Sequence, residues 1–101
     1  MAYDVVATRT FEHEYDSIIG YHANVLKSPG AARRLMEDVA RVRVSLAENP
    51  LLSAVSRKSA LEGLKLREKL VRNYVIVYKV DGDCVYLEHI FHQSQDFERL
   101  V

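Results

Sequence analysis

Hydrophobic and polar residues alternate in three parts of the chain, a spacing of two that is typical of β-strands. The first part is residues 3–8, and the second is residues 64–69. The third is the longer stretch 73–92, which is rich in β-branched and aromatic residues. Asp81-Gly82 divides this stretch and supplies two residues that tolerate positive φ, which predicts an antiparallel β-hairpin turning there.

Between the first of these parts and residue 50, the apolar positions follow a helical spacing instead. The spacing from Phe11 to Leu26 predicts an amphipathic helix, and Thr8 or Thr10 can cap its first amides. Ser28-Pro29 fits the N-cap and first position of a second helix, because proline has no N–H to lose there. Asn49-Pro50 ends this helix, and the short connection predicts an antiparallel helical hairpin packed on a sheet.

These elements predict an α+β fold in one domain, residues 1–101. An N-terminal strand precedes the helical hairpin, and a loop over residues 51–63 leads to a mainly antiparallel sheet of about four strands. A short helix over residues 96–101 closes the chain. Both faces of the strand at 74–80 are apolar, and the helices can cover only one of them. The other face is either the floor of a groove, covered by a partner chain, or covered by the loop and the C-terminal helix.

The composition excludes several classes of protein. The chain has 14 basic and 14 acidic side chains, and this balance argues against a protein that coats nucleic acid through bulk charge. Cys84 is the only cysteine, which excludes an intrachain disulfide and a cysteine cluster for zinc. The spacing of the histidines also predicts no metal site, and no cofactor is expected. Without a long apolar run or a signal sequence, we expect a soluble, cytoplasmic protein that does not enter a membrane.

Positive charge is nevertheless concentrated in one stretch. Residues 56–79 carry seven basic and two acidic side chains. Lys65, Arg67 and Lys69 should share one strand face, and Arg72 follows in the next turn. Alternate residues of a strand are about 7 Å apart, close to the separation of neighbouring phosphates along one strand of nucleic acid. These side chains are therefore candidates for binding RNA, and the alternative is an ordinary solvated face.

His92 stands at the end of the last predicted strand and is followed by several hydrogen-bonding side chains. Histidine can act as a general acid or base near neutral pH, so His92 is the candidate catalytic group. The alternative is a histidine that only bonds to a nearby carboxylate or carbonyl. His89 lies three residues earlier and should point to the opposite face, which leaves no metal-binding pair.

The order of these elements and four short segments resemble the RelE/ParE toxin family. The segments are residues 63–67, 73–78, 81–87 and the closing run His92-Gln93-Ser94-Gln95-Asp96. The resemblance extends along the whole chain. It implies the toxin of a bacterial type II toxin–antitoxin system, whose main partner is an antitoxin protein that wraps it.

The resemblance implies one of two activities. RelE-like members cut mRNA on the ribosome with basic residues of the sheet and acid/base groups, whereas ParE-like members inhibit DNA gyrase and are not nucleases. By this resemblance, Arg67 and Lys69 match paired basic positions of RelE-like enzymes, and His92 lies near their terminal catalytic segment. With Arg72, these residues form the candidate catalytic set of a metal-independent, ribosome-dependent mRNA endoribonuclease, which is the leading hypothesis.

Two departures from the RelE pattern keep other hypotheses open. RelE-like enzymes often carry arginine where this chain has Val75 and again where it has Gln93-Ser94. Such arginines stabilise charge on the transferring phosphate. The alternatives are therefore a gyrase inhibitor of the ParE type and a degenerate toxin that only binds its antitoxin.

Overall fold

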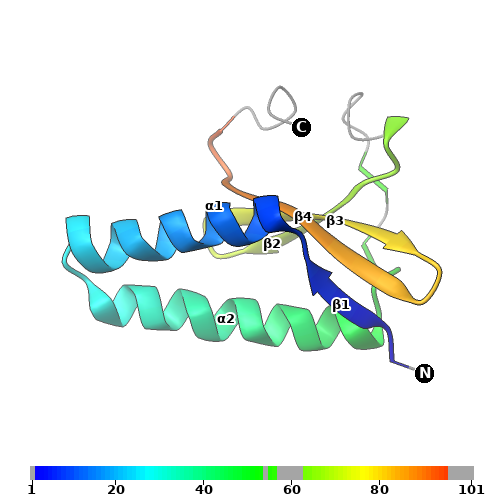
Figure 1. Cartoon of the computed structure of the whole chain (residues 1–101), viewed down its shortest axis with the longest axis horizontal. Coiled ribbons are helices and arrows are strands. Elements are labelled where there is room, and N and C mark those ends of the chain that lie inside the picture. The colour runs from blue at the N-terminus through cyan, green and yellow to red at the C-terminus, as the bar shows by residue number, and fades with distance from the viewer. Residues whose placement is uncertain (1, 54, 57–62, 96–101) are drawn as a thin grey trace.

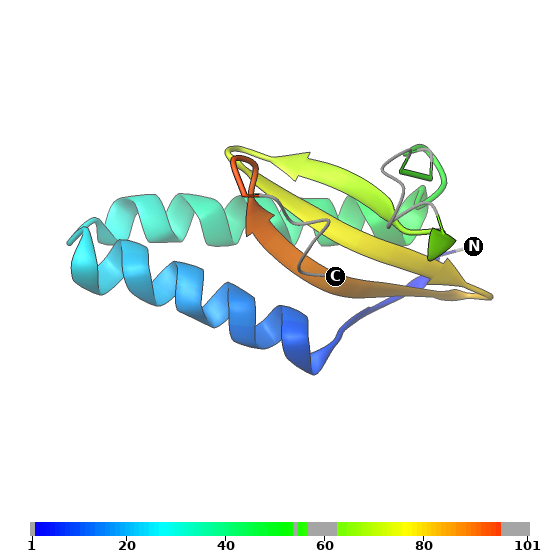
Figure 2. The same cartoon turned by 90° about the horizontal axis from the view of Figure 1, so that it is seen from above.

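The computed structural model describes residues 2–53, 55–56 and 63–95, and its helices and strands confirm the predicted α+β fold. Figure 1 shows both helices along one side of the sheet, and Figure 2 shows the opposite side from above. The predicted C-terminal helix lies outside the described residues. The elements are β1 (Asp4–Ala7), α1 (Arg9–Gly20), the π-helical turn η1 (Tyr21–Val25), α2 (Pro29–Glu48), β2 (Arg67–Val71), β3 (Tyr74–Asp81) and β4 (Cys84–His92).

The sheet has the strand order β1-β4-β3-β2, in which β1 is parallel to β4 and the other neighbours are antiparallel. β1 ends where Ala7 lies opposite Leu87, so in the described part of the chain no strand flanks residues 88–92 on that side. A register shift lies between Val77 and Tyr78 of β3, and Glu88 is the extra residue of β4 at this bulge.

The hairpin between β3 and β4 is present, but it turns one residue later than predicted. Asp81 pairs with Cys84, so Gly82 and Asp83 form a two-residue loop. Gly82 has a φ of +59°, whereas neither aspartate is among the described residues with positive φ. Positive φ at only the first loop position is the sign pattern of a type II′ turn. The turn therefore requires one residue in the left-handed region, and not two.

The helix boundaries follow the predicted signals. Thr8 caps α1, because its side-chain oxygen accepts a hydrogen bond from the amide of Phe11 at 3.1 Å. The same hydroxyl donates to the carbonyl of Leu87 at 2.9 Å, which ties the start of α1 to β4. Ser28 is the N-cap of α2 and Asn49 its C-cap. Neither helix in the described part of the chain is long and apolar enough to cross a membrane.

Buried apolar side chains form a cluster on each face of the sheet. The smaller cluster contains Leu66, Val75, Val77 and Phe91. Leu66 lies in the stretch 64–69 that was predicted as a strand, but it precedes β2 in the structure, and its side chain helps to cover the second face of the sheet. The larger cluster joins the helices to the sheet and consists of Phe11, Leu35, Val39, Leu46, Val71, Ile76, Tyr78, Val85, Leu87 and Ile90.

Candidate functional site

Lys65, Arg67 and Lys69 do not share one strand face, contrary to the prediction. Lys65 precedes β2 in a turn and has a φ of +57°. Arg67 and Lys69 lie opposite Tyr78 and Ile76 of β3, which belong to the core beneath the helices. Paired residues on neighbouring strands point to the same side, so these two cations lie on the face that the helices cover.

Arg67 has a structural partner at the start of β2. Its Nη1 donates a hydrogen bond to the carbonyl of Ser53, which anchors the segment after α2. Tyr78 lies opposite, and its buried hydroxyl donates to the carbonyl of Pro50 at 2.7 Å. Burial raises the pKa of Tyr78, while a hydrogen bond with Ser53 and the charge of Arg67 lower it by less. Arg67 therefore helps to hold the chain crossing from α2 to the sheet, and its role toward RNA stays a prediction.

Arg72 lies in the turn between β2 and β3 and ties this turn to α2. Its φ of +53° is uncommon for a residue with a long side chain, and such strain persists only where the surroundings impose it. The guanidinium forms an ion pair with Asp38, which also pairs with Arg41. The hydrogen bond from Arg72 is the largest of the effects that hold the pKa of Asp38 below its usual value. The charge of Arg72 is thus already paired.

His92 lies at the same end of the sheet as Arg72, because it pairs with Tyr74, which follows that turn. Its ring packs edge-on against the Tyr74 ring, with 5.4 Å between centroids. Nδ1 lies 3.1 Å from the backbone N–H of Ser94 and 2.7 Å from the hydroxyl of the same residue. Since an amide N–H can only donate, Nδ1 is an acceptor, and the proton of the neutral ring is on Nε2. The ring therefore presents a donor and not a base at Nε2.

The predicted catalytic set is spread along the sheet. Arg67 begins β2 and Arg72 follows its last residue, and a strand of this length extends about 13 Å between its ends. Lys69 lies between them. The fold thus brings Arg72 and His92 to one end of the sheet and leaves Arg67 at the other.

A second histidine meets Tyr74 from the helical side. His22, in η1, places Nε2 2.9 Å from the Tyr74 hydroxyl, and the two rings are 6.1 Å apart. His22 Nδ1 is buried and has no hydrogen-bond partner in the part of the chain that the structure describes. Burial raises the pKa of Tyr74, and Tyr21 adds to this increase. His22 belongs to the segment from Phe11 to Leu26 that was predicted to form an amphipathic helix, and its ring packs on the side that faces the sheet.

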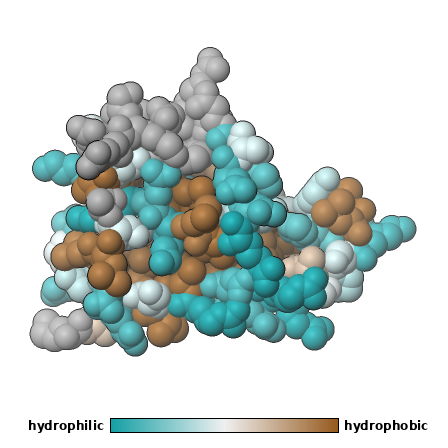
Figure 3. All heavy atoms as spheres, turned by 180° about the vertical axis from the view of Figure 1, so that it is seen from behind, coloured by the Kyte–Doolittle hydropathy of each residue, from teal (hydrophilic) through white to brown (hydrophobic). Residues whose placement is uncertain are grey.

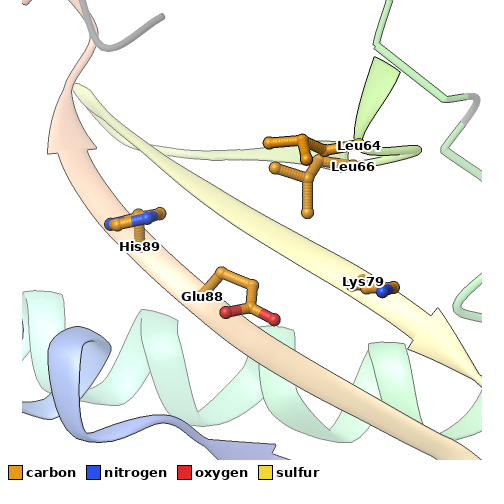
Figure 4. Close-up of a pocket in the computed structure, with 5 residues that line it drawn as sticks. All are labelled: Leu64, Leu66, Lys79, Glu88 and His89. Atoms are coloured by element: carbon orange, nitrogen blue, oxygen red, sulfur yellow. The ribbon is translucent and has the colours of Figure 1, made fainter. Parts of the chain in front are cut away.

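The face of the sheet opposite the helices contains a hollow, in keeping with the groove that was one of the alternatives for this face. Its volume is about 210 Å³, and its lining comes from β3, β4 and the segment before β2. Figure 4 shows the two leucines on one side of this hollow and the polar side chains on β3 and β4. The lining residues are Leu64, Leu66, Lys79, Glu88 and His89.

His89 is held at the edge of this hollow by Glu14 of α1. Its Nδ1 is 3.3 Å from each carboxylate oxygen, and one of these oxygens also accepts the backbone N–H of Ile90 at 3.1 Å. The ring stacks on Phe91, with 5.1 Å between centroids and 19° between planes. Because a carboxylate accepts hydrogen bonds, Nδ1 carries the proton, and Nε2 is an acceptor in the neutral ring.

His89 and His92 lie on opposite faces of the sheet, as predicted. His89 is opposite Val77, whereas His92 is opposite Tyr74. The contact between His89 and Glu14 could not have been predicted, because 75 positions separate the two residues. Lys79 and Glu88 were likewise missed, since each follows the ordinary alternation of a strand.

Comparison with known proteins identifies a family and a similar fold. Residues 5–97 match the family described as "ParE toxin of type II toxin-antitoxin system, parDE". No curated protein matches the sequence. The solved structure titled "Chromosomal ParDE TA system from P. aeruginosa" is similar with a TM-score of 0.70 and 17% sequence identity. The match covers 90% of this chain and 96% of that chain, and at this identity it shows the shared fold alone.

Proposed function

Since the chain belongs to the ParE toxin family of type II toxin–antitoxin systems, we propose that it inhibits DNA gyrase by binding it and does not cleave RNA. The toxin of such a system has an antitoxin protein as its partner. Within the wider RelE/ParE family, gyrase inhibition is the activity of ParE-like members, and mRNA cleavage is that of RelE-like members.

The separation of the predicted catalytic residues carries this proposal. RNA cleavage requires cations and an acid/base pair that converge on one phosphate at hydrogen-bond distance. Arg67 donates to the carbonyl of Ser53, and Arg72 pairs with Asp38. His92 presents a donor at Nε2, because Nδ1 accepts from the backbone. This arrangement favours an activity that depends on a surface and not on a catalytic centre.

Exposed apolar side chains support binding to a protein. Met36 and Val44, two helical turns apart on α2, are 47% and 60% exposed, and Leu70 of β2 is 61% exposed. Figure 3 shows patches of hydrophobic surface among hydrophilic ones on the side seen from behind. Exposed apolar surface of this kind is typical of protein-binding sites.

A supercoiling assay with purified gyrase and relaxed plasmid tests the proposal. We expect the purified protein to inhibit supercoiling and the cognate antitoxin to reverse the inhibition. Arg67→Ala and His92→Ala should inhibit as the unaltered protein does, provided that both remain folded by circular dichroism. Full gyrase activity at a large excess of folded toxin would contradict the proposal.

Ribosome-dependent cleavage of mRNA is the second candidate. The observation that favours it is the position of His92 beside the turn that carries Arg72, at one end of the sheet. In a reconstituted translation reaction, primer extension would then reveal codon-specific cuts that His92→Ala abolishes. Such cuts would replace the gyrase proposal with this one.

Expression of the chain alone separates both candidates from a degenerate toxin. We expect arrest of growth without the antitoxin and recovery with it. Harmless expression of folded protein that still binds its antitoxin would show that toxicity has been lost.

A further inference from the structure

The hollow in Figure 4 contains polar groups that the fold does not use. Among the described residues, no ion pair or hydrogen bond involves the side chain of Lys79 or Glu88, and Glu88 contributes only its backbone carbonyl to a hydrogen bond from Thr8. His89 uses Nδ1 to contact Glu14, so Nε2 is its remaining polar atom. A hollow that combines an unpaired donor, an unpaired acceptor and an oriented imidazole is typical of a binding site.

The other described residues of the lining are apolar. Leu66 is 4% exposed and packs with Val75, Val77 and Phe91, whereas Leu64 is 52% exposed at the rim. The volume of about 210 Å³ is below the range of roughly 300–1,000 Å³ of sites for drug-sized ligands. The hollow is therefore suited to one side chain of a larger partner.

The charges of the lining decide which side chain fits. A carboxylate would pair with Lys79 but also lie near Glu88, and a guanidinium or ammonium would pair with Glu88 but also lie near Lys79, so a like charge offsets the attraction in each case. A neutral hydroxyl can accept from Lys79 and donate to Glu88 or to His89 Nε2. Leu64 and Leu66 require an apolar body as well. The phenol of tyrosine combines both properties, whereas serine and threonine lack the apolar body and tryptophan can only donate.

We propose that this hollow is a socket for a tyrosine side chain of a partner protein. The ring packs against the leucines, and the hydroxyl bridges the polar groups of β3 and β4. Tyrosines seated in this way are frequent among the residues that contribute most to binding at interfaces. The proposal does not depend on the identity of the target, so a failure to inhibit gyrase leaves it unchanged.

Titration of the ¹⁵N-labelled full chain with p-cresol, the side chain of tyrosine as a free molecule, tests the proposal. We expect saturable shifts of the amides of Val77, Glu88 and His89. Toluene, which lacks the hydroxyl, should bind about three- to ten-fold more weakly, the range for one hydrogen bond. Lys79→Met and Glu88→Gln should each weaken p-cresol binding and leave toluene binding unchanged. Glu12→Gln, which changes an exposed carboxylate of α1, is the matched control.

Three results would overturn the proposal. The first is the absence of saturable shifts around the hollow in folded protein. The second is equal affinity for p-cresol and toluene, which would show that the polar groups take no part. The third is tighter binding of guanosine or of N-methylguanidine at the same amides, which would assign the hollow to a nucleobase or to an arginine.

Discussion

The carboxylate of Glu14 accepts a hydrogen bond from the backbone amide of Ile90 at 3.1 Å, at the place where β1 no longer flanks β4. The paired part of β4 ends at Leu87. Beyond it, the outward backbone N–H of His92 donates a hydrogen bond to the side-chain oxygen of Gln95 at 2.9 Å. Side chains thus replace a strand along this edge, and such capping hinders unwanted pairing with other strands.

Glu14→Ala should destabilise the protein by about 1–2 kcal/mol, because it leaves the Ile90 amide and the Nδ1–H of His89 without their acceptor. Urea denaturation at pH 7 measures this change in the free energy of unfolding. Glu14→Gln keeps an acceptor and should lower the free energy of unfolding by less than Glu14→Ala. Glu12→Ala, at an exposed position on the same helix, should change stability by only a few tenths of a kcal/mol. Equal effects of Glu14→Ala and Glu12→Ala would contradict the capping role.

The fold could be predicted from the sequence where its signals are local. Thr8 caps α1 through its side chain, Ser28-Pro29 and Asn49-Pro50 mark the two ends of α2, and the spacing of apolar residues separated helices from strands. The turn at Gly82 was predicted one residue early, because Asp81-Gly82 and Gly82-Asp83 are both acceptable loop pairs in isolation. The pairing of Asp81 with Cys84 selects the second, and that pairing follows from the register of the whole hairpin.

The candidate site could not be predicted to the same extent. Alternation placed Lys65 in a strand, but the chain turns there with positive φ, and β2 begins only at Arg67. Which face each cation occupies depends on the partners of β2, and these lie in β3. The contacts of Arg72 with Asp38 and of His89 with Glu14 join distant parts of the chain. A pattern of residue types contains no information about such contacts.

Asp38→Asn should destabilise the protein at neutral pH and have a smaller effect in acid. The hydrogen bond and charge of Arg72 hold the pKa of Asp38 below its unfolded value, so the ion pair stabilises the fold above about pH 4. This stabilisation is lost as the pH falls through the folded pKa. Urea denaturation at pH 7 and at pH 3 measures the difference between the two proteins. Glu37→Gln, an exposed neighbour on α2, is the control, and an Asp38→Asn effect that does not depend on pH would contradict this role.

Tyr78→Phe should cost about 1 kcal/mol at pH 7, because the carbonyl of Pro50 loses its buried donor. Burial raises the pKa of Tyr78 above its value in the unfolded chain. The neutral hydroxyl therefore stabilises the fold fully below about pH 10, and this contribution is lost as the pH rises through the folded pKa. In thermal unfolding between pH 7 and pH 11, the melting temperature of the variant should therefore fall less than that of the unaltered protein. The control is Tyr3→Phe, and an equally shallow profile for it would exclude Tyr78 as the source.

The hydrogen bond between His22 and Tyr74 predicts strong non-additivity. Tyr74→Phe removes the partner of His22 Nε2, and since Nδ1 already has none, the ring is left without any hydrogen bond. We expect Tyr74→Phe to lower the free energy of unfolding by about 1 kcal/mol. His22→Leu removes both ring nitrogens, including the buried Nδ1. It should therefore lower the free energy of unfolding by less than replacing a buried polar side chain whose polar atoms are all hydrogen-bonded.

Once His22 is leucine, Tyr74→Phe should cost almost nothing, because no imidazole remains to be left unpaired. Urea denaturation of the two single variants and the double variant gives a coupling free energy, which we expect to be about 0.5–1.5 kcal/mol. Additive losses would show that the 2.9 Å contact does not stabilise the fold. A measured coupling would instead show that the π-helical turn is held to the sheet through Tyr74, the residue against which His92 packs.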